Sequence, residues 1–374
     1  MGRWLADGGF PLQVSSIASM FDESSLVVVG REERGSGGLP LPSGATVVTL
    51  RNPHGQNLRR KISVILRFGE YLPTIVKHVR RADVVHVPVP GDISFLALCI
   101  ALMTGRRLLA RYEGSWFPNR QTTLMNRVTR AILRRIAGGK RVVIATGAGT
   151  SQPAPRIEWL FSTALTRSEL DQIQPILDRG LADPPRLIYA GRLSPEKGIP
   201  FLIRAIARLR DTNFAPLPRV TLVGDGVQRE ELESLVSQVG CENLIRFAGQ
   251  LDRARLSAEF ERADVCVQPS LSEGFSKAWL DAMAHGLPVI SSSVGAAPAV
   301  IGGQGERGWL IKPGDEMELT AVLKEVLGGA VNWLDLRQRC RSYAEEHTLE
   351  RWTEKIGHAC ARSWNLKFAN GKLS

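Results

Sequence analysis

Two acidic residues whose spacing could serve chemistry stand in the segment SEGFSKAWLDAMAHGLPVI, residues 272–290. Glu273 falls on a turn after the strand-like run VCVQPS, and Asp281 falls within the helix that follows. Both can reach one polar ligand, because ligands of parallel sheets settle at the carboxyl ends of the strands. As plainer alternatives, Glu273 could cap the helix and Asp281 could pair with Lys277 on the surface, worth only about 0.2–0.5 kcal/mol.

The turn between these acids also offers backbone donors. Gly274 has no side chain and permits a close approach of the backbone to a ligand. The amides of Phe275 and Ser276 precede the helix, where unsatisfied N–H groups favour an anion or a hydroxyl. The turn is therefore a candidate site for a charged or hydroxylated ligand.

Two basic residues occupy a similar position in AGRLSPEKGIPFLIRAI, residues 190–206. A strand ends at Gly191, and Arg192 and Lys197 flank the turn that leads into a helix. The planar fork of arginine and the point charge of lysine together suit a diphosphate. The alternative is a solvated loop in which Lys197 pairs with Glu196.

The elements that must position these residues alternate between strand and helix. In the second half, strands are predicted at 186–191, 219–224, 244–249, 265–270 and 288–293, with helices at 199–211, 229–240 and 256–264. In the first half, strands are predicted at 25–30, 46–50, 83–89, 107–112 and 141–146. This alternation is typical of α/β domains with parallel sheets. We expect an N-terminal domain over 1–170, a C-terminal domain over 171–345, and a terminal helix over 346–374 that packs on the N-terminal domain.

Length, charge and cysteine content narrow the possible functions. The 374 residues fit two domains, and five scattered cysteines without a CxxC pair argue against structural zinc or a disulfide framework. Residues 1–165 hold 22 Lys or Arg against 10 Asp or Glu, a net charge of +12 in a chain of +11. The N-terminal half is therefore expected to face something anionic. Neither a secretory signal nor a membrane-spanning run is predicted.

The most basic stretch, residues 119–141, contains seven Lys or Arg and no acid. On a helix its apolar residues from Leu124 to Ile136 form one stripe, with arginines beside it. This pattern indicates a helix that lies on anionic lipid, aided by residues 58–67; the alternative is an ordinary domain helix with a solvated basic face. Nucleic-acid binding is not expected, because no recognised binding motif is present and aromatic residues make up only 6% of the chain.

Four segments together point to a family. GRLSPEKG, VGDGVQREELE, IRFAGQL and PSLSEGFSKAWLDAMAHGLPVI occur in this order within residues 185–315. Their set and spacing resemble the C-terminal domain of retaining glycosyltransferases of family 4. The resemblance implies the GT-B fold, an α/β architecture of two Rossmann-like parallel-sheet domains facing a central cleft. It also implies a nucleotide-sugar donor and front-face attack by the acceptor without a covalent nucleophile.

The resemblance assigns a role to each matching position. Arg192 and Lys197 would hold the donor diphosphate and stabilise it as the leaving group, with Glu273 beside the transferred sugar. Asp281 would take the place of the family's usual glutamate and grip the ribose hydroxyls. The remaining donor-binding positions would be Gly191, Gly274, Phe275 and Ser276.

These residue types agree with the chemistry of glycosyl transfer. Fixed cations stabilise the charge that develops on the diphosphate, and a carboxylate stabilises the positive charge on the sugar. The chain has no Asp-x-Asp triplet that could chelate a metal-bound diphosphate. Neither a metal nor another cofactor is therefore expected.

The N-terminal half departs from the family pattern. Gly8 and Gly9 could form the loop that approaches the donor phosphates. A plain turn is the alternative, because MGRWLA, which precedes Asp7, is short for a buried strand. A histidine often follows one strand of this domain in the family, but RLLARYEGSW offers Glu113 and Trp116 there instead. His86, expected at the tip of another strand, could line the acceptor site or be structural.

These observations together predict a retaining glycosyltransferase that moves a sugar to a lipid-linked or saccharide acceptor. Its expected setting is bacterial polysaccharide or lipopolysaccharide synthesis, at the cytoplasmic face of the cell membrane. Two alternatives remain open: a sugar-nucleotide epimerase of the same fold, and a catalytically silent partner subunit.

Overall fold

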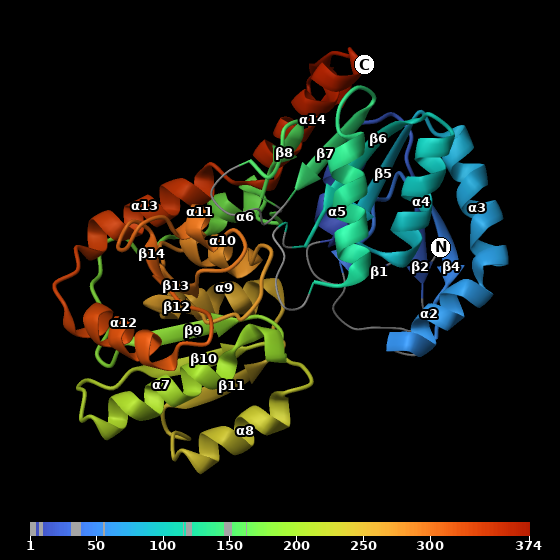
Figure 1. The fold of residues 1–374 in the computed structure, drawn as a ribbon. Helices are drawn as coiled ribbons and strands as arrows, with labels where there is room; N and C mark the ends of the chain where they lie inside the picture. The colour runs from blue at the N-terminus through green and yellow to red at the C-terminus, as the bar shows by residue number, and fades with distance from the viewer. Residues whose placement is uncertain are drawn as a thin grey trace. The chain divides into compact units, whose positions relative to one another are not determined.

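The computed structural model of the chain contains two compact units, coloured along the chain in Figure 1. The structure describes residues 5–6, 10–30, 39–54, 57–114, 116, 122–145, 152–161 and 163–374. The described residues of the C-terminal unit are Leu165–Thr348. The N-terminal unit combines the described residues up to Ala145 with Gln152–Ala164 and Leu349–Ser374. The boundaries lie a few residues from those expected at 170 and 345.

The C-terminal unit is built on a six-stranded sheet whose neighbouring strands all run parallel. In spatial order the strands are β11 (Ile245–Gly249), β10 (Arg219–Val223), β9 (Arg186–Ala190), β12 (Val265–Gln268), β13 (Val289–Ser292) and β14 (Gly308–Ile311). The strand order reverses between β9 and β12, since the chain extends the sheet first on one side and then on the other. Such a switch point is where open α/β sheets bind ligands.

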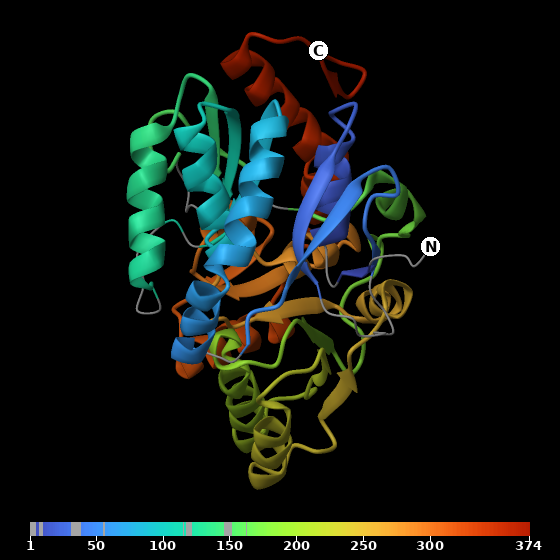
Figure 2. The same ribbon diagram turned by 90° about the vertical axis from the view of Figure 1, so that its right-hand side faces the viewer.

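Helices precede, connect and follow these strands along the chain and cover the sheet (Figures 1 and 2). They are α6 (Arg167–Gln172), α7 (Ile199–Asp211), α8 (Arg229–Gln238), α9 (Arg253–Arg262), α10 (Lys277–Ala284), α11 (Ala297–Ile301), α12 (Glu316–Gly328) and α13 (Trp333–Glu345). Leu202, Ile206 and Leu209 of α7 are fully buried, as their helical spacing predicts, and α12 packs against this helix.

A buried carboxylate joins the beginnings of the two central strands. Asp264, immediately before β12, accepts hydrogen bonds from the backbone amides of Arg186 (2.8 Å) and Ala182 (3.2 Å). Its other oxygen accepts one from Arg179 at 3.0 Å. Asp264 is fully buried, and a buried charge with this many partners fixes the strands that it connects. The loops that follow β9 and β12 therefore begin at strands that are held in fixed positions.

Before α14 (Leu349–Trp364), the described residues of the N-terminal unit form a four-stranded parallel sheet and two strand pairs. The sheet order is β5 (Val84–Val89), β6 (Arg107–Tyr112), β7 (Arg141–Ala145) and β8 (Ile157–Trp159). The pairs are β2 (Ser25–Gly30) with β4 (Thr46–Arg51), parallel, and β1 (Leu5–Ala6) with β3 (Leu39–Pro40), antiparallel. Its helices before β8 are α1 (Phe10–Ala18), α2 (Asn57–Leu66), α3 (Phe68–Arg81), α4 (Asp92–Met103) and α5 (Leu124–Ile136).

The last helix, α14 (Leu349–Trp364), belongs to the N-terminal unit and packs against α1 and β7 (Figure 1). Trp352, Ile356 and Cys360 are buried in one cluster with Ile17 and Met20 of the α1 region. A short hairpin of β15 (Phe368–Ala369) and β16 (Lys372–Leu373) follows. Residues of α14 and residues of the α1 region therefore share one core in the N-terminal unit.

Candidate functional site

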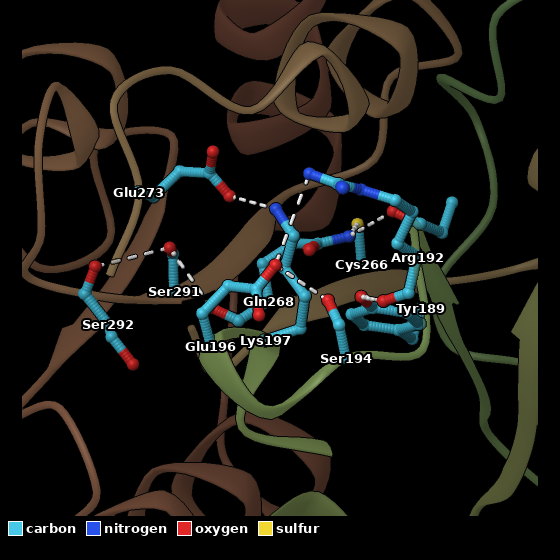
Figure 3. A network of polar contacts seen from close by, with 11 residues as sticks. Tyr189, Arg192, Ser194, Glu196, Lys197, Cys266, Gln268, Glu273, Ser291 and Ser292 are labelled. Atoms are coloured by element: carbon cyan, nitrogen blue, oxygen red, sulfur yellow. Dashed lines mark hydrogen bonds and ion pairs between the residues drawn. The ribbon is translucent and has the colours of Figure 1, made fainter. Parts of the chain in front are cut away.

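The loops that follow β9 and β12 bring Lys197 and Glu273 into direct contact (Figure 3). Lys197 ends the 3₁₀ turn η1 (Pro195–Lys197), and its Nζ donates a hydrogen bond to Oε2 of Glu273. The two side chains are only 14% and 13% exposed. Opposite charges that are this shielded from water interact more strongly than a surface pair does. The alternative pairing of Lys197 with Glu196 is thus replaced by a contact across the switch point.

Arg192 lies in the same loop and is the accessible cation of the group. Its side chain is 80% exposed, and Nη2 lies 4.0 Å from Oε1 of Glu196. The loop is fixed by the Tyr189 hydroxyl, which donates to the Arg192 carbonyl at 2.8 Å. Figure 3 shows the side chains of Arg192, Lys197 and Glu273 converging. One exposed cation beside a paired one forms a place where an anion can bind.

Glu196 remains ionised beside these cations. Partial burial favours its neutral form. The Ser194 hydroxyl, at 2.7 Å, and the nearby Arg192 charge nevertheless hold the pKa of Glu196 below its ordinary value. The carbonyl of Glu196 also accepts a hydrogen bond from the Leu271 amide at 2.8 Å, which ties the first loop to the second.

A close backbone contact sets the distance between the two loops. Gly198 has a φ of +65°, and a Cβ built there would lie 2.1 Å from the carbonyl oxygen of Pro269. Only glycine satisfies both conditions, because other residues resist positive φ and carry a Cβ. Gly198 thus lets the Lys197 loop approach the strand end that carries Glu273.

The turn at residues 274–276 begins α10, as the sequence predicts. Ser276 precedes the first helical residue and is nearly buried, and its side chain makes no capping hydrogen bond. Phe275 packs edge to face on the buried Trp279, with ring centroids 5.6 Å apart. The Gly274 carbonyl accepts a hydrogen bond from the Ala296 amide at 2.9 Å. The turn is therefore fixed on both sides, with the start of α10 at the strand tip.

Asp281 makes an ion pair that its sequence context did not predict. Its Oδ2 lies 3.1 Å from Nη1 of Arg253, the first residue of α9. Arg253 also binds Glu169 of α6, through Nε at 2.8 Å and Nη2 at 3.3 Å. Both carboxylates raise the pKa of Arg253, and the charge of Asp281 has the largest effect. The only sequence signal for Arg253 is its place just beyond the end of β11; Glu169 has no comparable signal.

The N-terminal candidates gather less clearly. His86 is the third residue of β5 and not at a strand tip, so the expected position is wrong. Burial, followed by the charge of Arg111, lowers the pKa of His86 well below its ordinary value, and its Nε2 has no partner among the described residues. Glu113 is half-exposed and pairs with Arg111, a fully buried residue whose guanidinium lies 5.1 Å from the Trp352 ring.

Trp116 lies in the interior of the N-terminal unit. It is fully buried and packs edge to face on Tyr112, with centroids 5.4 Å apart. Arg130 donates to its carbonyl at 2.6 Å. This placement gives the Trp116 side chain a packing role. Gly8 and Gly9 lie outside the described residues.

Metal ligands do not gather in the described part of the chain, where no three His, Cys, Asp or Glu side chains form a group that could hold an ion. The chemistry that the geometry offers is that of Arg192 and Lys197 as cations, Glu273 and Asp281 as carboxylates, and the first amides of α10.

Comparison with protein families and curated proteins identifies the segment that carries this geometry. Residues 184–328 match the family model of glycosyl transferases group 1. The sulfoquinovosyl transferase SQD2 of Arabidopsis thaliana is 26% identical over 304 residues, which are 76% of this chain and 58% of that protein. The MMP α-(1→4)-mannosyltransferase of Mycolicibacterium hassiacum is 38% identical over 133 residues, 36% of this chain and 32% of that protein. The chain thus spans about a third to somewhat over half of these relatives.

Solved structures match over nearly the whole chain. Sucrose-phosphate synthase from Thermosynechococcus elongatus has a TM-score of 0.69 at 20% identity, covering 94% of this chain and 91% of its own. HepE of Anabaena, solved in complex with UDP, has a TM-score of 0.68 at 18% identity, covering 96% and 98%. WaaG, a glycosyltransferase involved in lipopolysaccharide biosynthesis, has a TM-score of 0.64 at 17% identity, covering 93% and 94%. The predicted GT-B fold with two Rossmann-like domains is confirmed.

The approach at Gly198 generates a stability prediction. Gly198→Ala should lower the free energy of unfolding by about 1–2 kcal/mol for the positive φ and by about 1–3 kcal/mol more for the contact with the Pro269 carbonyl. Gly305→Ala is the matched control in the same unit, because Gly305 has a φ of +76° and open space around its Cβ position. Urea unfolding measures both; equal losses would show that the contact is not tight.

Proposed function

From the match of residues 184–328 to the glycosyl transferases group 1 model and from the GT-B fold, we propose that the chain is a retaining glycosyltransferase of family 4 that uses a nucleotide-sugar donor. The single observation that carries the proposal is the contact of Lys197 with Glu273 at the switch point, beside the exposed Arg192. A cationic subsite and a carboxylate stand next to each other there, as glycosyl–phosphate cleavage requires.

In the proposed reaction the donor diphosphate lies against Arg192 and Lys197, and the sugar lies beside Glu273. The bond from the anomeric carbon to the diphosphate oxygen breaks, and a bond to the acceptor hydroxyl oxygen forms on the same face. The acceptor proton passes to the departing diphosphate. The two cations stabilise the leaving group, Glu273 stabilises positive charge on the sugar, and neither a metal nor another cofactor takes part.

The donor is proposed to bind with its nucleoside along α10, where Asp281 would accept the ribose hydroxyls. Gly191 and the turn of Gly274, Phe275 and Ser276 would line the phosphates and the sugar. A structurally similar protein, HepE, has been solved with UDP and with UDP-glucose, which makes a uridine donor the first choice to test. Glu113 and His86 are left as acceptor-side candidates, whereas the burial of Trp116 speaks against a direct contact.

The acceptor is proposed to be lipid-linked, because one face of the N-terminal unit combines apolar and basic side chains. On α5, Leu124 is 76% and Val128 41% exposed, while Thr129 and Leu133 are buried. The predicted apolar stripe therefore faces outward in the first half of the helix, next to the exposed Arg127. Apolar side chains that reach acyl chains beside arginines that reach phosphates are typical of helices on anionic lipid.

A second helix adds to this face. Ile62 and Leu66 of α2 and Phe68 at the start of α3 are exposed. Figures 1 and 2 place α2 and the start of α5 toward the same end of the N-terminal unit. No helix among the described residues is long and apolar enough to cross a bilayer. We therefore propose peripheral binding at the cytoplasmic face of the membrane, in polysaccharide or lipopolysaccharide synthesis.

The proposed activity is tested first by nucleotide binding. UDP, GDP and ADP are added to the full chain, and one of them should raise the melting temperature by about 5 °C or more near 100 times its dissociation constant. Lys197→Ala should abolish the shift because it removes a diphosphate contact. Lys355→Ala, on the exposed side of α14, is the control.

An activity assay then distinguishes the glycosyltransferase from the epimerase and the catalytically silent partner. Transfer from the matching nucleotide sugar to a bacterial lipid extract should proceed in EDTA, and proton NMR of the product should show retention at the anomeric carbon. Donor isomerised without acceptor would indicate the epimerase, and the absence of any nucleotide shift would indicate the silent partner.

The ion pair makes Glu273 a competitor of the donor phosphate for Lys197. Glu273→Gln should therefore bind free nucleoside diphosphate more tightly, on the order of tenfold, while its transfer rate falls by about a hundredfold or more. Isothermal titration calorimetry and initial rates measure the two effects. Glu233→Gln, which alters an exposed pair with Arg229, serves as the control. Weaker diphosphate binding by the Glu273 variant would contradict the competition.

The proposed membrane face predicts selective lipid binding. Flotation with phosphatidylglycerol vesicles should recover the protein, with release at 1 M salt, and phosphatidylcholine vesicles should not bind it. Leu124→Ser with Val128→Ser should weaken binding about tenfold or more, because both side chains would leave the acyl region. Met317→Ser with Leu334→Ser, exposed residues of the C-terminal unit, form the matched control. Equal loss in both double variants would remove the assignment.

A further inference from the structure

All three nitrogens of the Arg253 guanidinium bind carboxylate oxygens of two residues. Nε and Nη2 bind the two oxygens of Glu169, at 2.8 and 3.3 Å, and Nη1 binds Oδ2 of Asp281 at 3.1 Å. These three residues come from α9, α6 and α10. A planar fork that is held at three nitrogens has one orientation, so Arg253 presents Nη1 to Asp281 in a fixed direction.

Glu169 is itself held rigidly. It forms a capping box with Thr166, whose amide and hydroxyl both donate to Oε2 at 3.0 Å, while the hydroxyl accepts from the Glu169 amide at 3.1 Å. These bonds and the Arg253 contacts hold the pKa of Glu169 below its ordinary value even though its partial burial acts in the other direction. Glu169 therefore remains an anion and a firm base for Arg253.

Asp281 is left with one oxygen available to a ligand. Its side chain is only 13% exposed, and within the described part of the chain its sole side-chain bond is that of Oδ2 to Arg253. The backbone at this position is fixed as well, because the Asp281 carbonyl lies 2.7 Å from Nδ1 of the buried His285. The cluster of Glu169, Asp281 and Arg253 carries one more negative than positive charge, so the cation does not cancel the acceptor capacity of Asp281.

We propose that Arg253, held by Glu169, is a positioning residue that aims the free oxygen of Asp281 at the ribose of the donor and thereby sets a preference for ribonucleotides over 2′-deoxyribonucleotides. This inference rests on the proposed nucleotide-sugar site. A free aspartate can rotate about its side-chain bonds, whereas one held at Oδ2 keeps Oδ1 in place. A nucleotide without the 2′-hydroxyl would leave the free oxygen of the largely buried Asp281 carboxylate without a hydrogen-bond donor. Sites that are built to bind a hydroxyl reject ligands that lack it.

The competing explanation is a purely structural clamp of α6 to α10, and the chain contains a matched control for it. Arg341 of α13 also bridges these helices, donating to the Leu170 carbonyl at 3.0 Å and the Ala284 carbonyl at 2.7 Å. Arg341→Met removes a bridge between the same helices without touching Asp281. A structural role predicts similar behaviour of the two arginine variants, and a positioning role predicts different behaviour.

The experiment compares ribonucleoside and 2′-deoxyribonucleoside diphosphates by isothermal titration calorimetry, using UDP, GDP, ADP and their 2′-deoxy counterparts. The wild-type chain should bind the preferred ribonucleotide at least about tenfold more tightly than its deoxy form. Arg253→Met should bring this ratio close to one by weakening only the ribonucleotide. Asp281→Asn should do the same, and the double variant should lose no more than either single one. Arg341→Met should keep the wild-type ratio.

Each outcome decides between the claims. Equal binding of the ribo and deoxy forms by the wild type would overturn this inference and leave the glycosyltransferase proposal intact. If Arg253→Met binds the ribonucleotide and its 2′-deoxy form more weakly to the same extent, or keeps the wild-type ratio of the two affinities, Arg253 is a structural clamp. If that variant fails to fold, Arg253→Lys, which keeps the charge and loses the fork, should show the reduced ratio. Absence of binding by all six nucleotides would overturn the proposed function and this inference with it.

Discussion

The contact between the Lys197 ammonium and the Glu273 carboxylate is the interaction on which the rest of the site depends. Two opposite charges can stay together with little exposure only if the surrounding chain holds them there, since their desolvation opposes the pairing. The reversal of strand order supplies the two loops, Gly198 lets them approach, and Asp264 fixes the strands behind them. The pair also brings together a cation that is proposed to bind phosphate and an anion that is proposed to lie beside the sugar.

The positions of Lys197 and Glu273 could be predicted from the sequence, because the ends of parallel strands have a recognisable pattern. Runs of β-branched residues that stop at glycine or at a polar turn indicate where each parallel strand delivers its loop, and Lys197 and Glu273 both stand in such loops. The same rule failed for His86, which lies within β5, because the run VVHVPV continues past it. Trp116 followed a strand as expected, but packing on Tyr112 buried its side chain. Alternating periodicity places the backbone and does not decide which side chains turn inward.

Contacts between helices were beyond the reach of the sequence. The partners of Asp281 come from α9 and α6, and nothing in the local pattern of α10 relates it to residues 253 or 169. The buried Arg111 is a similar case, because a charged residue within a strand-like run gives no sign of an aromatic ring contributed by α14. Local propensity is informative over one turn or one strand, whereas these pairings arise when distant segments pack together.

The position of α14 also constrains the order in which the protein can mature on the ribosome. The described residues of the C-terminal unit run from Leu165 to Thr348, so all of its described strands have been synthesised before α14 begins. The N-terminal unit starts first, yet Trp352, Ile356 and Cys360 fill its interior from the far end of this sequence. Since domains fold as units during vectorial synthesis, the unit that is translated first is completed last. Until then the apolar face of α1 is exposed, and the unit that is proposed to bind nucleotide can finish folding ahead of the unit that is proposed to meet the membrane.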